Sequence, residues 1–541
     1  MTTEHDYIVV GSGSAGAAVA ARLSEDSGVS VLLIEAGGRD SHPFQLMPLA
    51  FLKLGRAQRG IWEYFSEPEP GLNGRRLRIA RGRTLGGSSS INAMIAIRGN
   101  ARDYDIWAEQ GCTGWSYADV LPYFKRLERS WRGAGPYHGA DGPVGISPMR
   151  GADLLYEPLL EAARAAGIPE SEDANGAVQD GISRMEATIG AGKRASAARA
   201  YLYPALGRAN LTILRDALTE KILIENGRAV GIAYRKDGER QTVRAGREII
   251  ICAGAFNSPQ ILMLSGIGPA DELKAAGVDP VHDLPGVGRN LSDHPNIITG
   301  YRLHGGEGLT RHLRYDRAGW LAARWFARAD GPFAWNGASA NIFLRTQDGL
   351  DRPDVQLISM PVSNTADLWL KKPKFEISVR GGALHPKSRG WVKLGSADPT
   401  AAPRIQFNMF AESDDLATMV RAVKASRDIY AQSPLREMIH SESLPGADVR
   451  TDADIAGYLR ANAWHRAHPV GTCRMGVDGD AVVDPELRVR GIEGLRIADA
   501  SIMPEVPGGN TNLPSIMIGE KVADMVLGRS LPRAHLPSAG R

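Results

Sequence analysis

Apolar and polar positions near the start of the chain follow two patterns in turn. A β-branched run from Tyr7 to Val10 predicts a buried strand, small residues after it predict a helix, and a second apolar run that ends at Glu35 predicts another strand. Strand, helix and strand in this order predict a βαβ unit with parallel strands. The N-terminal part of the chain is therefore expected to be of the α/β class.

Later segments first repeat the apolar strand pattern and then show an alternating pattern of apolar and polar residues. Runs at 211–224, 229–234 and 248–254 read as strands that return to the first sheet. Between about Tyr301 and Ile455, alternating runs at 375–384 and 390–396 and an amphipathic stretch at 414–432 predict an antiparallel sheet backed by helices. We therefore expect a chain that is α+β overall. A discontinuous Rossmann-like domain is predicted over 1–155, 190–300 and 456–541, and a second domain over 156–189 and 301–455.

The turn after the first strand carries Gly11-x-Gly13-x-x-Gly16. Glycines at this spacing allow a tight turn and close approach of the backbone to a pyrophosphate, while an acid at the end of the second strand accepts hydrogen bonds from ribose hydroxyls. The motif predicts a dinucleotide with a free ribose 2′-hydroxyl, either FAD or NAD and not NADP. The predicted contacts are Gly11, Ser12, Gly13, Ser14, Ala15, Gly16, Glu35 and Ala36.

Composition and charge indicate what kind of molecule the protein binds. The 541 residues are 43% hydrophobic and 23% charged, and the net charge of +3 is spread along the chain without a basic block. Neither a nucleic-acid arm nor a membrane-binding basic patch is indicated, so we expect a small-molecule partner. Three cysteines argue against a disulfide framework and for a reducing compartment. No signal peptide or transmembrane run is recognisable, which makes a cytoplasmic location the expectation.

A second glycine-rich loop follows at 81–107, "RGRTLGGSSSINAMIAIRGNARDYDIW". By composition it is either a serine-rich hairpin turn or a loop that presses its backbone against a bound ligand. The segment resembles the first signature of the glucose-methanol-choline (GMC) oxidoreductase family, and "GAFNSPQILMLSGIGP" at 254–269 is similar to the second. Further blocks resembling the family extend from about Asp6 to Leu527.

The resemblance implies FAD rather than NAD. It implies additional flavin contacts at Gly86, Ser90, Asn92, Ala93, Met94, Ile95, Thr219, Asp499, Ala500, Asn510, Asn512 and Leu513. Some relatives carry a histidine that binds the flavin covalently at the position of Ile91, so noncovalent FAD is expected here.

The stretch "ANAWHRAHPVGTCRMG" at 461–476 contains His465 and His468. A neutral histidine suits the base that an alcohol oxidation needs, and residue type alone does not choose between the two. No third and fourth ligands stand nearby, so no metal site is expected. The resemblance places the catalytic histidine directly before a "PVGT" turn, which is His468, and its partner at Asn512. Asn512 is equally compatible with capping a helix.

The expected reaction is oxidation of an uncharged alcohol, primary and aryl or aliphatic, to the aldehyde, with oxygen or another electron acceptor. Relatives that oxidise choline carry a glutamate where this chain has Ser339, so choline is not expected. Trp335 and Trp464 are predicted to line the substrate pocket with Ser339, and Trp320, Trp325 and Phe333 are further candidates for an apolar wall. The alternatives are a GMC-type lyase without net redox and an oxygen-using alcohol oxidase.

Overall fold

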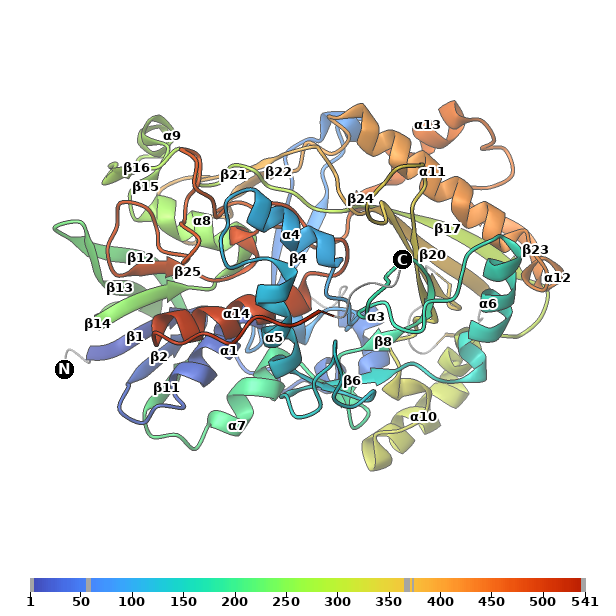
Figure 1. Cartoon of the computed structure of the whole chain (residues 1–541), viewed down its shortest axis with the longest axis horizontal. Coiled ribbons are helices and arrows are strands. Elements are labelled where there is room, and N and C mark those ends of the chain that lie inside the picture. Colours follow the sequence, from blue (N-terminus) through green and yellow to red (C-terminus); the bar gives the residue numbers. More distant parts are fainter. Residues whose placement is uncertain (1–3, 55–59, 364–369, 372–373, 537–541) are drawn as a thin grey trace.

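A computed structural model describes residues 4–54, 60–363, 370–371 and 374–536 of the chain. Residues 1–3 and 537–541, the two ends of the predicted first domain, lie outside the described part. Two seven-stranded sheets organise the molecule, one on the left and one on the right of Figure 1.

The first sheet is built around the predicted βαβ unit. Its strands β11, β2, β1, β14 and β25 run parallel, and β14, β13 and β12 continue it as an antiparallel meander. Their bounds are β1 (Glu4–Val10), β2 (Val31–Ile34), β11 (Leu211–Leu214), β12 (Ala217–Glu225), β13 (Arg228–Lys236), β14 (Glu239–Ile251) and β25 (Leu495–Ile497). The central strands β1 and β2 are buried along Tyr7–Val10 and Val31–Ile34, as expected of parallel strands covered on both faces.

Helices cover this sheet. The small residues of α1 (Ser14–Leu23) let α14 (Asn512–Val526) pack closely beside it, and α14 also packs on α5 (Tyr117–Leu127). Figure 1 shows α14, in red, running alongside α1. The buried face of α14 includes Ile516, Val522 and Ala523. The N-termini of α1 and α14 therefore begin near each other.

The second sheet is antiparallel, in the order β23-β17-β20-β19-β18-β7, with β24 paired to β17. Its strands are β7 (Gly181–Arg184), β17 (Pro295–Leu303), β18 (Ala340–Leu344), β19 (Val355–Met360), β20 (Glu376–Ala383), β23 (Ile439–Leu444) and β24 (Trp464–His465). Residues of one parity, such as Leu357 and Val379, form a core with α6 (Tyr156–Ala165) and α11 (Ser413–Tyr430). Residues of the other parity, such as Ile358 and Arg380, face a cavity between the two sheets.

These two sheets confirm the predicted fold class. The sequence-based boundary at 300/301 falls inside β17, which belongs to the second sheet from Pro295 onward, and β24 brings 464–465 into that sheet from a segment predicted for the first domain. Strand pairing with distant segments decides both assignments, and local pattern carries no information about it.

Candidate active site

A cavity of about 270 Å³ lies at the carboxyl ends of β1 and β2. Its wall includes the predicted contacts Gly11, Gly13, Ser14, Ala15, Glu35, Ala36, Thr219, Asp499 and Ala500. Glu35 is fixed there because its carboxylate accepts hydrogen bonds from the Ser12 hydroxyl (2.7 Å) and the Gly37 amide (2.8 Å). In open α/β sheets, nucleotides bind at the carboxyl ends of the parallel strands.

Five predicted cofactor contacts lie behind the cavity walls. Ser12 holds Glu35, and Gly16 packs so closely that a Cβ there would meet the Gly11 carbonyl oxygen at 1.9 Å. Ser90 donates to the Leu85 carbonyl, Gly86 forms the turn, and Leu513 is buried in the core. These residues shape the site and do not line it.

The second glycine loop packs directly onto the first. The Gly86 amide donates to the Ser12 carbonyl (3.0 Å), and a Cβ added to Gly87, whose φ is +51°, would lie 2.8 Å from the Cα of Gly13. The buried guanidinium of Arg194 donates to the carbonyls of Ser89 and Asn92 and fixes the far end of the loop. Where the two glycine loops meet, backbone atoms make the contact, which allows a dinucleotide to approach closely.

A second cavity of about 670 Å³ adjoins the first, and Ser14, Arg81, Ser88, Ala500 and Ser515 line both. The loop residues Ile91, Asn92, Ala93, Met94 and Ile95 form one side of it, and His468, Asn510 and Asn512 lie on its wall. A ligand with its nucleotide end in the first cavity extends naturally into the second. The two cavities therefore fit an extended dinucleotide such as FAD.

Hydrogen bonds fix the protonation pattern of His468. The Leu384 carbonyl can only accept, so His294 Nε2, 3.0 Å away, carries a proton. In neutral His294 the Nδ1 atom is then an acceptor, and it lies 2.9 Å from His468 Nδ1, which must donate. Neutral His468 is thereby left with an unprotonated Nε2, which accepts from the Asn510 amide at 3.0 Å. This nitrogen faces the cavity, and its only hydrogen bond among the described residues is the one from the Asn510 side-chain amide, which a ligand in the cavity could displace.

Burial keeps His468 neutral. Burial first, and then the neighbouring groups His294, Arg466 and Arg81, lower the pKa of His468 well below its usual value. The Asp293 carboxylate anchors the backbone by accepting from the amides of Arg466 (3.2 Å) and His468 (3.0 Å). The imidazole is thus held in one place and in one charge state at neutral pH.

His465 lines the same cavity but has no free ring nitrogen. Its Nε2 donates to the Arg78 carbonyl (3.1 Å), its Nδ1 accepts from the Ala467 amide (3.0 Å), and its ring stacks on Phe407. Burial lowers the pKa of His465 to about 4. This environment is that of a structural histidine.

The two asparagines have different partners. Asn510 is the one in contact with His468, and its Oδ1 is buried with no partner among the described residues. Asn512, the first residue of α14, accepts a hydrogen bond from the Ser14 hydroxyl (2.8 Å) and links the starts of α1 and α14. The structure thus places Asn510, which the sequence treats only as a flavin contact, in direct contact with His468.

Of the predicted substrate-pocket residues, Trp464 lines the cavity and Trp335 and Ser339 do not. Ser339 is buried inside the second sheet region, and Ala338 reaches the cavity in its place. Trp335 packs over Gly151, Trp325 donates to the Gly192 carbonyl, and Trp320 is exposed. The apolar lining instead comes from Phe51, Leu52, Met94, Ile358 and Met360.

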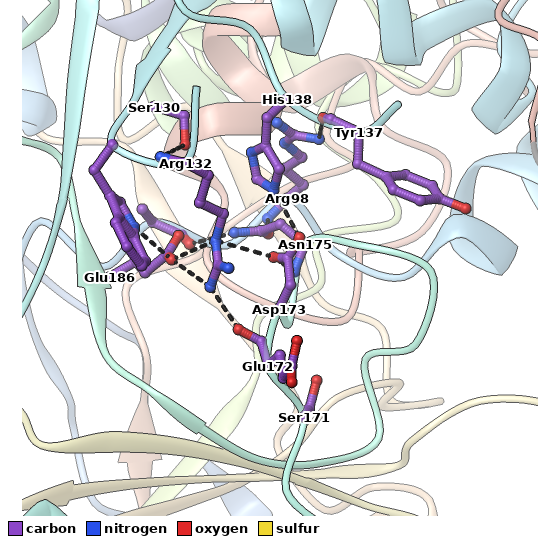
Figure 2. A network of polar contacts seen from close by, with 12 residues as sticks. Arg98, Ser130, Arg132, Tyr137, His138, Ser171, Glu172, Asp173, Asn175 and Glu186 are labelled. Atoms are coloured by element: carbon purple, nitrogen blue, oxygen red, sulfur yellow. Dashed lines mark hydrogen bonds and ion pairs between the residues drawn. The ribbon is translucent and has the colours of Figure 1, made fainter. Parts of the chain in front are cut away.

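A buried polar network around Arg98 holds the end of the second glycine-rich loop, residues 81–107, which we call the flavin loop (Figure 2). His138 lies between Glu128 (2.8 Å) and Asp173 (2.7 Å), and Arg98 pairs with Glu128 at 2.6 Å. The Arg98 amide donates to the side chain of Asn175, which in turn donates to the carbonyl of Ala96 next to the cavity. The network ties three distant segments to the end of the loop.

The network predicts a pH-dependent stability. Burial alone lowers the pKa of His138, but hydrogen bonds to Asp173 and Glu128 outweigh it and raise the pKa to about 9 from 6.5. The stabilisation is complete below pH 6.5 and is lost as the pH rises through about 9, with an upper bound on the order of 3 kcal/mol. Denaturant unfolding at pH 7 and pH 9.5 should show a larger loss in the wild type than in His138→Gln. Equal losses in the two proteins would contradict the assignment.

Comparison with known proteins identifies the family. The GMC oxidoreductase family model matches residues 5–296, and its C-terminal counterpart matches 386–519. The chain belongs to the GMC oxidoreductase family. It is 44% identical to an oxygen-dependent choline dehydrogenase of Rhizobium etli, over 97% of this chain and 96% of that protein.

Solved structures agree with this assignment. A pyridoxine 4-oxidase from Mesorbium loti has a TM-score of 0.86 and 32% identity over 96% of this chain and 98% of its own. A formate oxidase has a TM-score of 0.91 and 27% identity, with 97% and 98% covered. This GMC oxidoreductase therefore binds FAD and oxidises CH–OH groups, and the choice of FAD over NAD is confirmed. None of its described helices combines the length and apolar character needed to cross a bilayer.

Ile91 lies on the wall of the larger cavity, at the position where some relatives carry the histidine that binds flavin covalently. A carbon side chain cannot attack a flavin methyl group, so we expect FAD to be released on unfolding. Acid precipitation should leave a yellow supernatant over a colourless pellet. A pellet that stays yellow after washing in denaturant would show a covalent bond.

Proposed function

We propose that this GMC oxidoreductase oxidises an alcohol that carries no positive charge, with His468 as the base. The observation that supports the proposal is the hydrogen-bond chain from Leu384 through His294 to His468. It leaves a lone pair on His468 Nε2 at the wall of the larger cavity.

When bound, FAD accepts the hydride from the carbinol carbon. His468 Nε2 takes the hydroxyl proton, and the proton that its Nδ1 shares with His294 keeps the ring in place. The Asn510 amide, 3.0 Å from Nε2, is placed to donate to the substrate oxygen as that oxygen gains negative charge. The N-terminus of α14, which carries Asn512, adds a positive dipole end to the same wall.

The lining of the cavity argues against a cationic substrate. No Asp or Glu occurs among the described residues of its wall. A desolvated quaternary ammonium needs a carboxylate or an aromatic cage to offset its lost hydration. Trp464 and Phe51 are the only aromatic residues apart from histidine in the described wall. A primary alcohol with an aryl or aliphatic body suits this lining better than choline does.

Parallel assays with oxygen and with an artificial dye, on choline and on benzyl-type and medium-chain alcohols, test the proposal. We expect turnover of alcohols without positive charge by at least one acceptor, and the faster acceptor decides between dehydrogenase and oxidase. Efficient saturation by choline alone would overturn the substrate assignment.

A further inference from the structure

Two arginines on the wall of the larger cavity, Arg380 and Arg466, form no hydrogen bond to an acidic side chain among the described residues. Arg380 projects from β20, and Arg466 stands two residues before His468. Within the described residues, the guanidinium of Arg380 makes no hydrogen bond or ion pair. Arg466 donates only to neutral oxygens, namely the side chains of Asn296 (3.2 Å) and Gln356 (2.6 Å) and the carbonyls of Gln356 and Arg380.

The Asp293 carboxyl offsets this positive charge only in part, since its charge raises the pKa of Arg466 but does not outweigh burial and Arg380. Asp293 uses one oxygen for the backbone amides of Arg466 and His468, its other oxygen has no hydrogen bond among the described residues, and burial raises its pKa to about 7. Burial, followed by the positive charge of Arg380, lowers the pKa of Arg466 to about 9. Two half-buried like charges that Asp293 offsets only in part are unfavourable in the free protein, and an anion bound beside them would relieve that cost.

The position of the arginines separates them from the cofactor. Neither Arg380 nor Arg466 lines the nucleotide cavity, whereas Arg81 lines both cavities and stands at the junction where the cofactor passes from one to the other. Arg380 lies on the sheet that faces the flavin loop across the cavity. An anion that meets Arg380 therefore belongs to the substrate.

We propose that the substrate is an alcohol that also carries an anionic oxygen group, a carboxylate or a phosphate, which Arg380 binds. This inference rests on the proposed function and narrows it, because an uncharged alcohol fits a wall without acids but leaves both guanidinium groups without an anionic hydrogen-bond partner. Arg466 is held by amide and carbonyl oxygens and adds positive potential without needing to move. Arginine suits the role because its planar group donates two parallel hydrogen bonds to an oxyanion.

The strand places Arg380 away from the start of the hydrogen-bond chain to His468. Arg380 is four residues before Leu384, whose carbonyl begins the hydrogen-bond chain to His468. At ~3.3 Å per residue, the two backbone positions are ~13 Å apart along the strand. The anion is therefore expected at the end of the substrate remote from the carbinol, as in a para-substituted benzyl alcohol.

Three matched alcohols test the inference on the FAD-loaded enzyme: 4-(hydroxymethyl)benzoate, 4-(hydroxymethyl)phenyl phosphate and neutral 4-methylbenzyl alcohol. We expect kcat/KM for at least one anionic alcohol to exceed that of the neutral one by roughly tenfold to hundredfold, the worth of a charge-assisted hydrogen bond. Whichever anion is preferred identifies the group. A neutral alcohol that equals or exceeds both anions overturns the inference.

Variants of Arg380 test whether this residue causes the preference for anionic alcohols. Arg380→Gln should abolish most of the preference, chiefly through a higher KM for the anionic alcohol, and Arg380→Lys should retain part of it. Arg302→Gln, which removes an exposed arginine from the neighbouring strand β17, should leave the preference unchanged. FAD absorbance and melting temperature check that each variant is folded. A preference that survives in folded Arg380→Gln would contradict the role of Arg380.

The outcomes distinguish a failure of this inference from a failure of the proposed function. If the neutral alcohol reduces the flavin and the anions show no advantage, alcohol oxidation stands and the anion site is wrong. If no alcohol of any charge reduces the bound flavin, both the proposed function and the inference built on it are wrong.

Discussion

Replacing His468 with alanine is expected to slow anaerobic flavin reduction by roughly 10²- to 10⁴-fold, the usual contribution of a general base. The reason is local: His468 Nε2 is the ring nitrogen that the chain through His294 leaves unprotonated, and no neighbouring side chain among the described residues is positioned to replace it. Stopped-flow loss of flavin absorbance at saturating alcohol measures the effect directly.

His465→Ala is the matched control, since His465 lies in the same loop and lines the same cavity. Because both of its ring nitrogens are bonded to backbone groups, its loss should lower stability more than the rate of flavin reduction. Equal losses of rate in the two variants would mean that the base is misassigned or that the two histidines act as a unit.

Gly87→Ala is expected to yield a protein largely free of FAD. The new Cβ would lie 2.8 Å from the Cα of Gly13, and alanine at φ +51° adds strain of about 1–3 kcal/mol. The two glycine loops would separate, and FAD affinity should fall by at least about tenfold. Titration of the apoprotein with FAD gives the dissociation constant.

Gly74→Ala controls for backbone strain alone. Gly74 has φ +74°, but a Cβ added there would meet no described atom within 4 Å, and the residue lines neither cavity. This variant should lose some stability and keep its FAD. A comparable loss of FAD in both variants would contradict the view that contact between the loops forms the cofactor site.

Local pattern was sufficient to predict the scaffold. The βαβ unit, the returning strands of the first sheet and the helix at 413–430 each follow from periodicity within a short window. The glycine spacing and Glu35 at the strand end likewise place the nucleotide cavity, because that geometry is set within a single supersecondary unit.

The arrangement around the base could not be predicted in the same way. His294 is 174 residues from His468, and only strand pairing in the second sheet brings Leu384, His294 and His468 into line. Asn510 and Asn512 differ by two residues at the start of a helix, and the orientation of that helix decides which of them meets His468. Arg380 stands inside an ordinary strand pattern and gives no local signal of its place in the cavity.

The central claim is hydride transfer from an alcohol to bound FAD with the hydroxyl proton taken by His468. The most direct test is anaerobic mixing of the holoenzyme with an oxidisable alcohol and with the same alcohol deuterated at the carbinol carbon. We expect loss of flavin colour, one carbonyl product per FAD, and a several-fold slower reduction with the deuterated alcohol. Consumption of the alcohol while the flavin stays fully oxidised would contradict it.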